Sequence, residues 1–407
     1  MNAIWLILLC GAVLVGALSG RINQVTGAAF SSAESAVTIA LGLIGIMTLW
    51  LGILKVAEEA GMIRLLARLI RPLSRRLFPQ VPPDHPAMGA MLLNISANWL
   101  GLGNAATPLG IKAMEHLQEL NDDKERATDA MILFLALNTA SITLVPMTII
   151  AVRASLGSAH PAEIIGPTIL SSLCATLAAI AAVKLFVAGT TGTGLSPRVI
   201  VKFIFALLLA AVLVILILRL GRSGYLPSET FKTAVGLLST WAIPALLFII
   251  PLMAVFKRVR IYEVFIEGAK EGFQVAVRLI PFLVALLVAI GMFRASGALE
   301  FLVRLLSPIT NLIGMPAEVL PAALVRPLSG SGALGVITEL LETHGPDSFI
   351  GRLASTLYGC TETTFYVIAV YFGSVDVKKI RYAVPAGLIA DAAGILAALL
   401  VCRAVFN

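Results

Sequence analysis

The stretch YGCTETTFYV, residues 358–367, interrupts an apolar run that extends from about residue 349 to residue 373. Glu362 lies near the centre of this run, and threonines 361, 363 and 364 surround it. A carboxylate at the centre of a membrane-crossing segment costs about 2.5–3.5 kcal/mol on insertion scales. We therefore expect Glu362 to face a partner or a cavity. Gly359 loosens the helix here, so the stretch predicts a spanning helix with a polar interruption.

The composition of the whole chain predicts a helical membrane protein. Of its 407 residues, 58% are hydrophobic and only 13% are charged, and the mean hydropathy is +0.95. A soluble domain carries roughly 25% charged residues. The net charge of +7 falls mostly in short loops, where it reports membrane orientation rather than nucleic-acid binding. We expect an all-α polytopic membrane protein.

Apolar segments long enough to cross a bilayer recur along the chain. They lie near residues 2–19, 36–57, 129–152, 163–187, 199–218, 235–256, 275–293, 350–372 and 382–402. Two further apolar segments, 88–114 and 320–340, are broken by Gly, Pro, Ser and Asn, which predicts re-entrant helical hairpins. Two amphipathic segments, 62–78 and 262–279, predict helices in the headgroup plane, with ordinary loop helices as the alternative.

The two halves of the sequence resemble each other. Residues 61–79 parallel residues 297–316, and residues 129–186 align without a gap to residues 347–404, which pairs Asp129 with Asp347. The expected domains are a first repeat over 1–187, a linker with one extra span over 188–233, and a second repeat over 234–407. The first repeat contains an even number of spans and the linker adds one. The second repeat is therefore predicted to be inverted in the membrane.

Loop charges give an independent prediction of orientation. With the N-terminus inside, 17 Lys and Arg residues fall in inside loops and 8 in outside loops. This excess follows the positive-inside rule. We expect a multi-pass protein of the bacterial inner (plasma) membrane, with its N-terminus in the cytoplasm and its C-terminus outside.

Inverted repeats with discontinuous helices bind solutes where paired interruptions meet near the midplane. The interruptions here are the hairpin tips 98–108 and 326–333 and the polar stretches 137–146 and 358–367. The candidate substrate-binding residues are Asn98, Asn104, Thr107, Asn138, Ser141, Thr143, Arg326, Ser329, Ser331, Thr361, Glu362, Thr363 and Thr364. The alternative is that these small and polar residues pack helices closely.

Two carboxylates are candidates for ion coupling, Glu362 and Asp391, because both lie inside spanning segments. The facing hairpin suggests Arg326 as the partner of Glu362. A purely structural ion pair or hydrogen bond is the alternative for both Glu362 and Asp391, and Arg326 could equally extend toward the membrane surface.

No enzyme motif accompanies these residues. The four histidines lack metal-ligand spacing, no phosphate-binding loop occurs, and the four cysteines form no CxxC pair. We expect neither catalysis nor a cofactor nor a bound metal.

The chain resembles a known family at these motifs. The segments NISANWLGLGNAATPLGIKAM (94–114) and LNTASITLVP (137–146) are similar to spore maturation protein A. The segments 262–297, RPLSGSGALGVI (326–337) and YGCTETTFYVIAVYFG (358–373) are similar to spore maturation protein B. Both halves resemble the nucleoside recognition, or Gate, domain, which also occurs in concentrative nucleoside transporters and ferrous iron transporters. The resemblance implies a transporter-like inverted-repeat fold.

The expected function is secondary transport or export of a small polar solute, nucleoside-like or amino-acid-like, by alternating access between the repeats. H⁺ or Na⁺ is the expected coupling ion, and the lipid bilayer and a second copy of the chain are further expected partners. The alternative is a non-transporting scaffold of spore maturation or envelope assembly.

Overall fold

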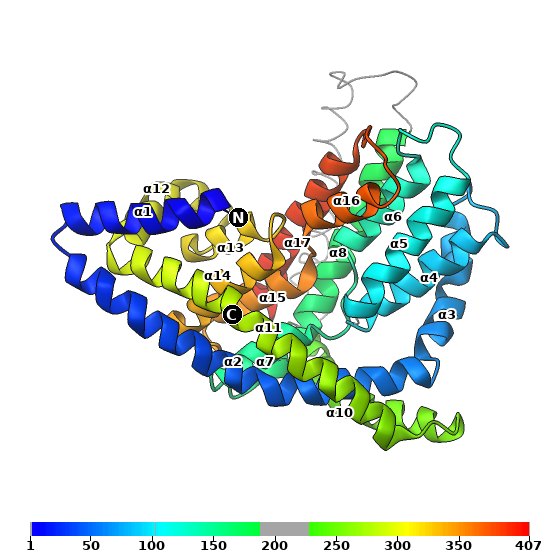
Figure 1. Cartoon of the computed structure of the whole chain (residues 1–407), viewed down its shortest axis with the longest axis horizontal. Coiled ribbons are helices and arrows are strands. Elements are labelled where there is room, and N and C mark those ends of the chain that lie inside the picture. The colour runs from blue at the N-terminus through cyan, green and yellow to red at the C-terminus, as the bar shows by residue number, and fades with distance from the viewer. Residues whose placement is uncertain (1, 102, 188–227, 407) are drawn as a thin grey trace. The chain divides into compact units, whose positions relative to one another are not determined.

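The computed structural model describes residues 2–101, 103–187 and 228–406 (Figure 1). This part of the chain folds into helices and contains no β-strand. The first half contains α1 (Asn2–Leu18), α2 (Ile22–Glu59), α3 (Met62–Leu77), α4 (Pro86–Trp99), α5 (Gly103–Glu119), α6 (Asp129–Thr139), α7 (Met147–Ser155), η1 (Pro161–Ile164) and α8 (Ile165–Val187). The second half contains α10 (Ser228–Phe256), α11 (Ile261–Ala295), α12 (Ala298–Ile313), η2 (Ala317–Val319), α13 (Leu320–Val325), α14 (Gly330–His344), α15 (Phe349–Cys360), α16 (Thr364–Gly373) and α17 (Ala383–Phe406).

Five of the described helices are long and apolar enough to cross a membrane. They are Ile22–Glu59, Pro161–Val187, Phe231–Phe256, Ile261–Ala295 and Ala383–Phe406. The all-α polytopic class is thereby confirmed. The predicted span at 199–218 lies outside the described residues, as does most of the predicted linker 188–233.

The expectation of a separate interfacial helix over 262–279 is wrong. This segment forms one continuous 35-residue helix, α11, with the span that follows it. Pro281 is the only proline in α11, and it lies inside the helix rather than ending it. A proline removes one backbone hydrogen bond, which a long packed helix can tolerate.

The polar stretches do break their helices, as predicted. The run 129–152 is divided into α6 and α7, and the run 350–372 into α15 and α16. The predicted hairpins also form as pairs of helices joined by a short tip, α4 with α5 and α13 with α14. The described part of the chain therefore has two hairpins and two discontinuous helices.

The order of helices repeats along the sequence. The series α3–α8 and the series α12–α17 each contain an amphipathic helix, a hairpin, two half-helices and a long final helix. The gap-free alignment pairs Ile165 with Ala383, the first residues of the two final helices. This order supports the repeat, while its inversion and the three-part division of the chain stay predictions.

Two compact units form, and each combines both halves of the sequence. Unit 1 comprises Met1–Lys55, Met147–Ala162 and Tyr262–Tyr358, and unit 2 comprises Val56–Pro146, Glu163–Ile261 and Gly359–Asn407. Unit 1 contains the hairpin α13–α14 and the half-helix α15, together with α7 from the other repeat. Unit 2 contains the hairpin α4–α5 and the half-helix α6, together with α16. Each unit thus exchanges one half-helix with the other repeat.

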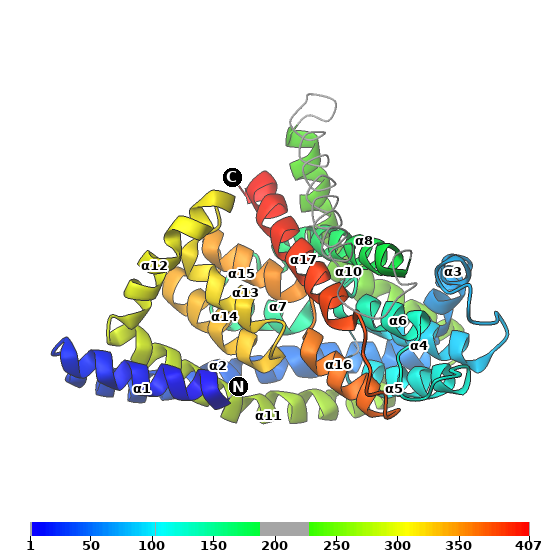
Figure 2. The same ribbon diagram turned by 90° about the horizontal axis from the view of Figure 1, so that it is seen from above.

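Close backbone packing holds unit 1 together along α2 and α11 (Figure 2). A Cβ atom on Gly268 would lie 2.5 Å from the Leu51 carbonyl oxygen, and one on Gly272 would lie 2.5 Å from the Met47 carbonyl oxygen. Only glycine permits this approach. Small residues at helix contacts are typical of membrane proteins, where close van der Waals packing drives helix association.

In unit 2, α8 packs along α17 (Figure 2). The buried apolar cluster of unit 2 includes alanines from both helices, and small residues let helix backbones approach closely. These alanines are Ala175, Ala178, Ala179 and Ala182 on α8, and Ala383, Ala386, Ala390 and Ala393 on α17. This pair is the support against which the broken helices of unit 2 rest.

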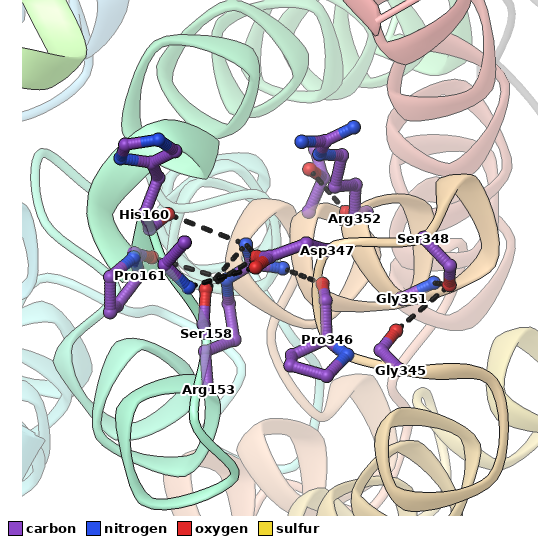
Figure 3. Close-up of polar contacts among 12 residues, drawn as sticks. Arg153, Ser158, His160, Pro161, Gly345, Pro346, Asp347, Ser348, Gly351 and Arg352 are labelled. Carbon is purple, nitrogen blue, oxygen red and sulfur yellow. Dashed lines mark hydrogen bonds and ion pairs between the residues drawn. The ribbon is translucent and has the colours of Figure 1, made fainter.

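A buried arginine fastens the start of α15 in unit 1 (Figure 3). Arg153 is fully buried, and its Nη2 atom lies 2.9 Å from Asp347 Oδ1. Ser158 Oγ donates to the same carboxylate oxygen at 2.5 Å, and the Ala159 amide donates to Oδ2 at 2.8 Å. Arg153 Nε also donates to the Pro161 carbonyl. Asp347 thus joins α15 to the loop that follows α7.

Asp129, the repeat counterpart of Asp347, makes the equivalent contact in unit 2. Its Oδ1 atom lies 2.6 Å from Arg381 Nη1 and accepts a hydrogen bond from Tyr382 Oη at 2.5 Å. Arg381 Nη1 also donates to the Ala127 carbonyl. Both aspartates therefore fasten a first half-helix to the loop after the other repeat's second half-helix. We call these two contacts the aspartate clamps.

Partial burial of Asp347 acts to raise its pKa, but the hydrogen bonds from Ser158 and Ala159 and the charge of Arg153 outweigh this effect and lower the pKa. A lowered folded-state pKa means that the charged form stabilises the fold above the ordinary aspartate value of about 3.9. This stabilisation is lost only as the pH falls through the lowered pKa. The clamp in unit 1 therefore stays charged at neutral pH.

We predict that Asp347→Asn lowers the apparent stability of the purified protein by about 1–3 kcal/mol, because it removes the charged partner of a buried arginine. Thermal unfolding in detergent at pH 7 measures this loss. The control is Glu125→Gln, which breaks an exposed 2.7 Å pair with Lys378 and should leave the melting temperature unchanged. Equal melting temperatures for Asp347→Asn and the wild type would contradict the prediction.

Candidate functional site

The two polar helix breaks meet within unit 2. The amide of Glu362, in the second break, donates to the carbonyl of Thr139 at the end of α6 at 2.8 Å. The amide of Leu144, in the first break, donates to the Trp99 carbonyl at the end of α4 at 3.1 Å. Thr176 Oγ1 on α8 donates to the Ala140 carbonyl. Both breaks and the end of the first hairpin helix are therefore joined by hydrogen bonds at one place.

A cluster of amides and a phenol lies beside the breaks. Asn138 Oδ1 accepts hydrogen bonds from Asn98 Nδ2 at 2.7 Å and from Tyr371 Oη at 3.1 Å. Asn94 Nδ2 donates to Tyr371 Oη at 3.1 Å and to the Ala106 carbonyl at 2.7 Å. Four helices, α4, α5, α6 and α16, are thus linked by one network. We call Asn94, Asn98, Asn138 and Tyr371 the asparagine cluster.

One oxygen atom in this cluster can accept a further hydrogen bond. Asn94 is fully buried, and among the described residues its Oδ1 atom has no hydrogen-bond partner. An unsatisfied buried acceptor costs free energy unless a donor or a cation reaches it. The cluster can therefore accept a hydrogen bond from a water or from a polar solute.

The threonines of the second break face α17. Thr364 Oγ1 donates to Asp391 Oδ2 at 2.5 Å, and Asp391 is only 2% exposed. A Cβ atom on Gly387 would lie 2.6 Å from the Thr364 methyl carbon, and one on Gly394 would lie 2.7 Å from that of Thr361. These two glycines lie seven residues apart on one face of α17. They provide the space into which the broken helix packs.

Glu362 differs from its neighbours because its side chain is exposed, whereas Thr361, Thr363 and Thr364 are buried. The second break therefore presents a carboxylate on its outer side and hydroxyls on its inner side. Asp391 is the buried carboxylate of this site and Glu362 is the accessible one.

The predicted residues of the second hairpin lie in unit 1. Arg326 is 3% exposed, and its guanidinium carbon lies 4.4 Å from the centre of the Tyr358 ring, a cation–π distance. Ser329 caps α14 by accepting a hydrogen bond from the Gly332 amide at 3.0 Å, and its hydroxyl lies 3.4 Å from that of Ser331. Arg326 and Glu362 belong to different units, so their pairing stays a prediction.

None of the hydrogen bonds described above links the remaining predicted residues to the asparagine cluster. Thr107 is partly buried on α5. Ser141 is buried in the first break, where its carbonyl accepts a 3.4 Å hydrogen bond from Thr143. The side chain of Asn104 lies outside the described part of the chain.

Two cluster members, Asn94 and Tyr371, are absent from the predicted site. Their spacing could have indicated them. Asn94 precedes Asn98 by four residues and Tyr371 follows Thr364 by seven, and both spacings place residues on the same helix face. Of these two residues, Asn94 was the easier to recognise, because it is an asparagine inside an apolar hairpin helix.

The fold and this site define a polytopic all-α membrane protein with a polar site at two discontinuous helices. The model of the Gate family, described as "nucleoside recognition", matches residues 40–156 and 276–378, which together are more than half of the chain. The chain therefore belongs to the nucleoside recognition, or Gate, family.

Curated relatives agree with this membership. The chain is 46% identical over 180 residues to spore maturation protein A of Bacillus subtilis strain 168, covering 92% of that protein and 44% of this chain. It is 50% identical over 170 residues to spore maturation protein B of the same strain, covering 96% of that protein and 42% of this chain. It is 32% identical over 84 residues to the inner membrane protein YjiG of Escherichia coli K12, covering 55% of that protein and 20% of this chain. No solved structure matches the chain.

We predict that Asn138→Ala destabilises the protein by about 1–3 kcal/mol, because it leaves the Asn98 amide and the Tyr371 hydroxyl without their shared acceptor. Tyr371→Phe should cost less, about 1 kcal/mol, since Asn98 keeps its bond to Asn138. Thermal unfolding of the single and double variants measures the coupling, expected at about 0.5–3 kcal/mol. The control is Tyr366→Phe on the exposed side of α16, and a simply additive double variant would contradict a shared network.

Proposed function

We propose that this protein is a secondary transporter or exporter of a small polar solute and that it catalyses no chemical step. The observation that carries the proposal is the meeting of two broken helices beside the asparagine cluster. Broken helices at membrane depth need protein or a wet cavity to satisfy their freed backbone groups. Transporters use such sites to bind solutes and ions.

The chemistry of the site favours a neutral or zwitterionic solute with several hydrogen-bonding groups. Amides and a phenol can both donate and accept, and Asn94 Oδ1 offers an acceptor within a buried setting. Nucleoside-like and amino-acid-like molecules have this character. The names of the relatives in Bacillus subtilis concern spore maturation, which leaves open the alternative of a scaffold role in that process.

Glu362 and Asp391 suit ion coupling in different ways. Asp391 lies beside Thr364 within the helix bundle of unit 2, and Glu362 is exposed at the break. A proton or Na⁺ that neutralises one of these carboxylates would change the cost of holding it at membrane depth. Alternating access between the repeats then follows if the solute and the ion bind with different affinities in the two states.

The proposed solute should stabilise the purified wild-type protein in a thermal-shift screen of nucleosides, amino acids and dipeptides. Saturation at about 100 times the dissociation constant stabilises a protein by about 2.7 kcal/mol. Asn138→Ala should abolish the shift and Glu362→Gln should reduce it or remove its dependence on pH or Na⁺. Uptake or efflux in proteoliposomes with an imposed H⁺ or Na⁺ gradient then measures transport.

Glu34→Gln provides the matched control, because Glu34 is also an exposed carboxylate within an apolar helix. It should retain the full shift. A wild type that no solute stabilises, or a Glu362→Gln variant that complements a deletion strain fully, would argue against transport and favour the scaffold role.

A further inference from the structure

The outer face of α3 carries a dense row of positive charge. The helix contains five arginines and no acidic residue. Arg64, Arg68, Arg71 and Arg75 recur at spacings of three and four, which places them on one face, and all four are exposed, as is Arg76. Arg71 lies 3.3 Å from Asp84 in a pair whose side chains are both largely exposed. Exposed pairs of this kind contribute little, so the face remains strongly positive.

An exposed apolar stripe runs beside the arginines. Leu65, Leu69 and Leu73 follow each other at intervals of four residues and are 46%, 69% and 54% exposed. A third side of the helix, which includes Ile63 and Ile70, is buried. The helix therefore has a buried seam, a leucine stripe and an arginine row.

We propose that this exposed face of α3 binds anionic phospholipids. The arginines pair with headgroup phosphates through charge-assisted, bidentate hydrogen bonds. The leucine stripe enters the adjoining acyl region, as in amphipathic helices that lie in the interface. Each basic residue near an anionic membrane surface adds to the electrostatic attraction. An arginine row directly beside large exposed leucines fits a surface that is anionic and apolar at once.

The counterpart helix α12 shows that the charge is particular to α3. Phe301 and Leu305 leave a similar apolar stripe exposed, at 70% and 62%. However, α12 carries one arginine, Arg304, and one acid, Glu300. Selectivity for anionic lipid is therefore assigned to α3 and not to α12.

The buried seam of α3 connects this face to the first hairpin. Ile63 forms one apolar cluster with Ala97, Leu100 and Ala106 at the hairpin tip. The same hairpin helix α4 carries Asn94 of the asparagine cluster. Lipid bound to α3 thus supports the element that bears the candidate site, although the lipid proposal does not depend on the proposed function.

The test compares lipid affinities of the full-length protein in detergent by native mass spectrometry. The test variant is Arg64→Gln, Arg68→Gln, Arg75→Gln, which keeps good helix formers and leaves the Arg71–Asp84 pair intact. The matched control is Lys257→Gln, Arg260→Gln, Lys270→Gln, which removes three exposed charges elsewhere. Phosphatidylglycerol is the anionic probe and phosphatidylcholine the neutral one.

The wild type should prefer phosphatidylglycerol, and the test variant should bind it about tenfold more weakly or worse while its phosphatidylcholine affinity stays the same. The control variant should match the wild type, and replacing the same three arginines by lysine should retain most of the preference. If the triple variant fails to fold, the three single variants carry the test. An unchanged preference, an equal loss in the control, or a change in oligomeric state without a change in lipid affinity would overturn the proposal.

Discussion

The backbone at the helix breaks is the constraint on which the rest of the structure depends. A chain this apolar cannot leave amides and carbonyls unsatisfied at membrane depth. In unit 2 the carbonyl of Thr139 accepts from the Glu362 amide, and the carbonyl of Ala140 accepts from the Thr176 hydroxyl. The second break therefore satisfies one of the backbone hydrogen-bonding groups that the first break leaves free. Hydrogen bonds within the protein therefore satisfy carbonyl groups at the end of α6.

The exchange of half-helices follows from the same constraint. Because the first break pairs with the second, α6 of one repeat must lie beside α16 of the other. The aspartate clamps secure this arrangement away from the breaks. Asp129 and Asp347 occupy matching positions in the two repeats, and each holds an arginine that comes from the other repeat. The repeats are consequently interleaved within each unit rather than folded as separate halves.

Composition and hydrophobic period were enough to predict the class, the hairpins and the breaks, because these depend on local sequence. The continuity of α11 was not predicted, because the charged, amphipathic pattern over 262–279 differs from the apolar run that follows it, although both belong to one helix. The site was predicted in part. Asn98 and Asn138 stand out as asparagines near Gly and Pro, whereas Asn94 and Tyr371 become site residues only through contacts between helices far apart in sequence. The buried position of Arg153 has the same origin, because Asp347 lies 194 residues further along the chain.

The two repeats share a helix order but not the same polar side chains. In the gap-free alignment Tyr371 corresponds to Arg153, so one position serves the asparagine cluster in unit 2 and a clamp in unit 1. Asn138 corresponds to Thr356, whose hydroxyl donates to the Arg352 carbonyl of its own helix. The short helix α13 offers no asparagine to match those of α4. Matching positions of the two repeats therefore carry the asparagine cluster in unit 2 and a clamp in unit 1. For the transporter proposed above this asymmetry would matter, because a solute can shift the balance between two states only if it binds them unequally.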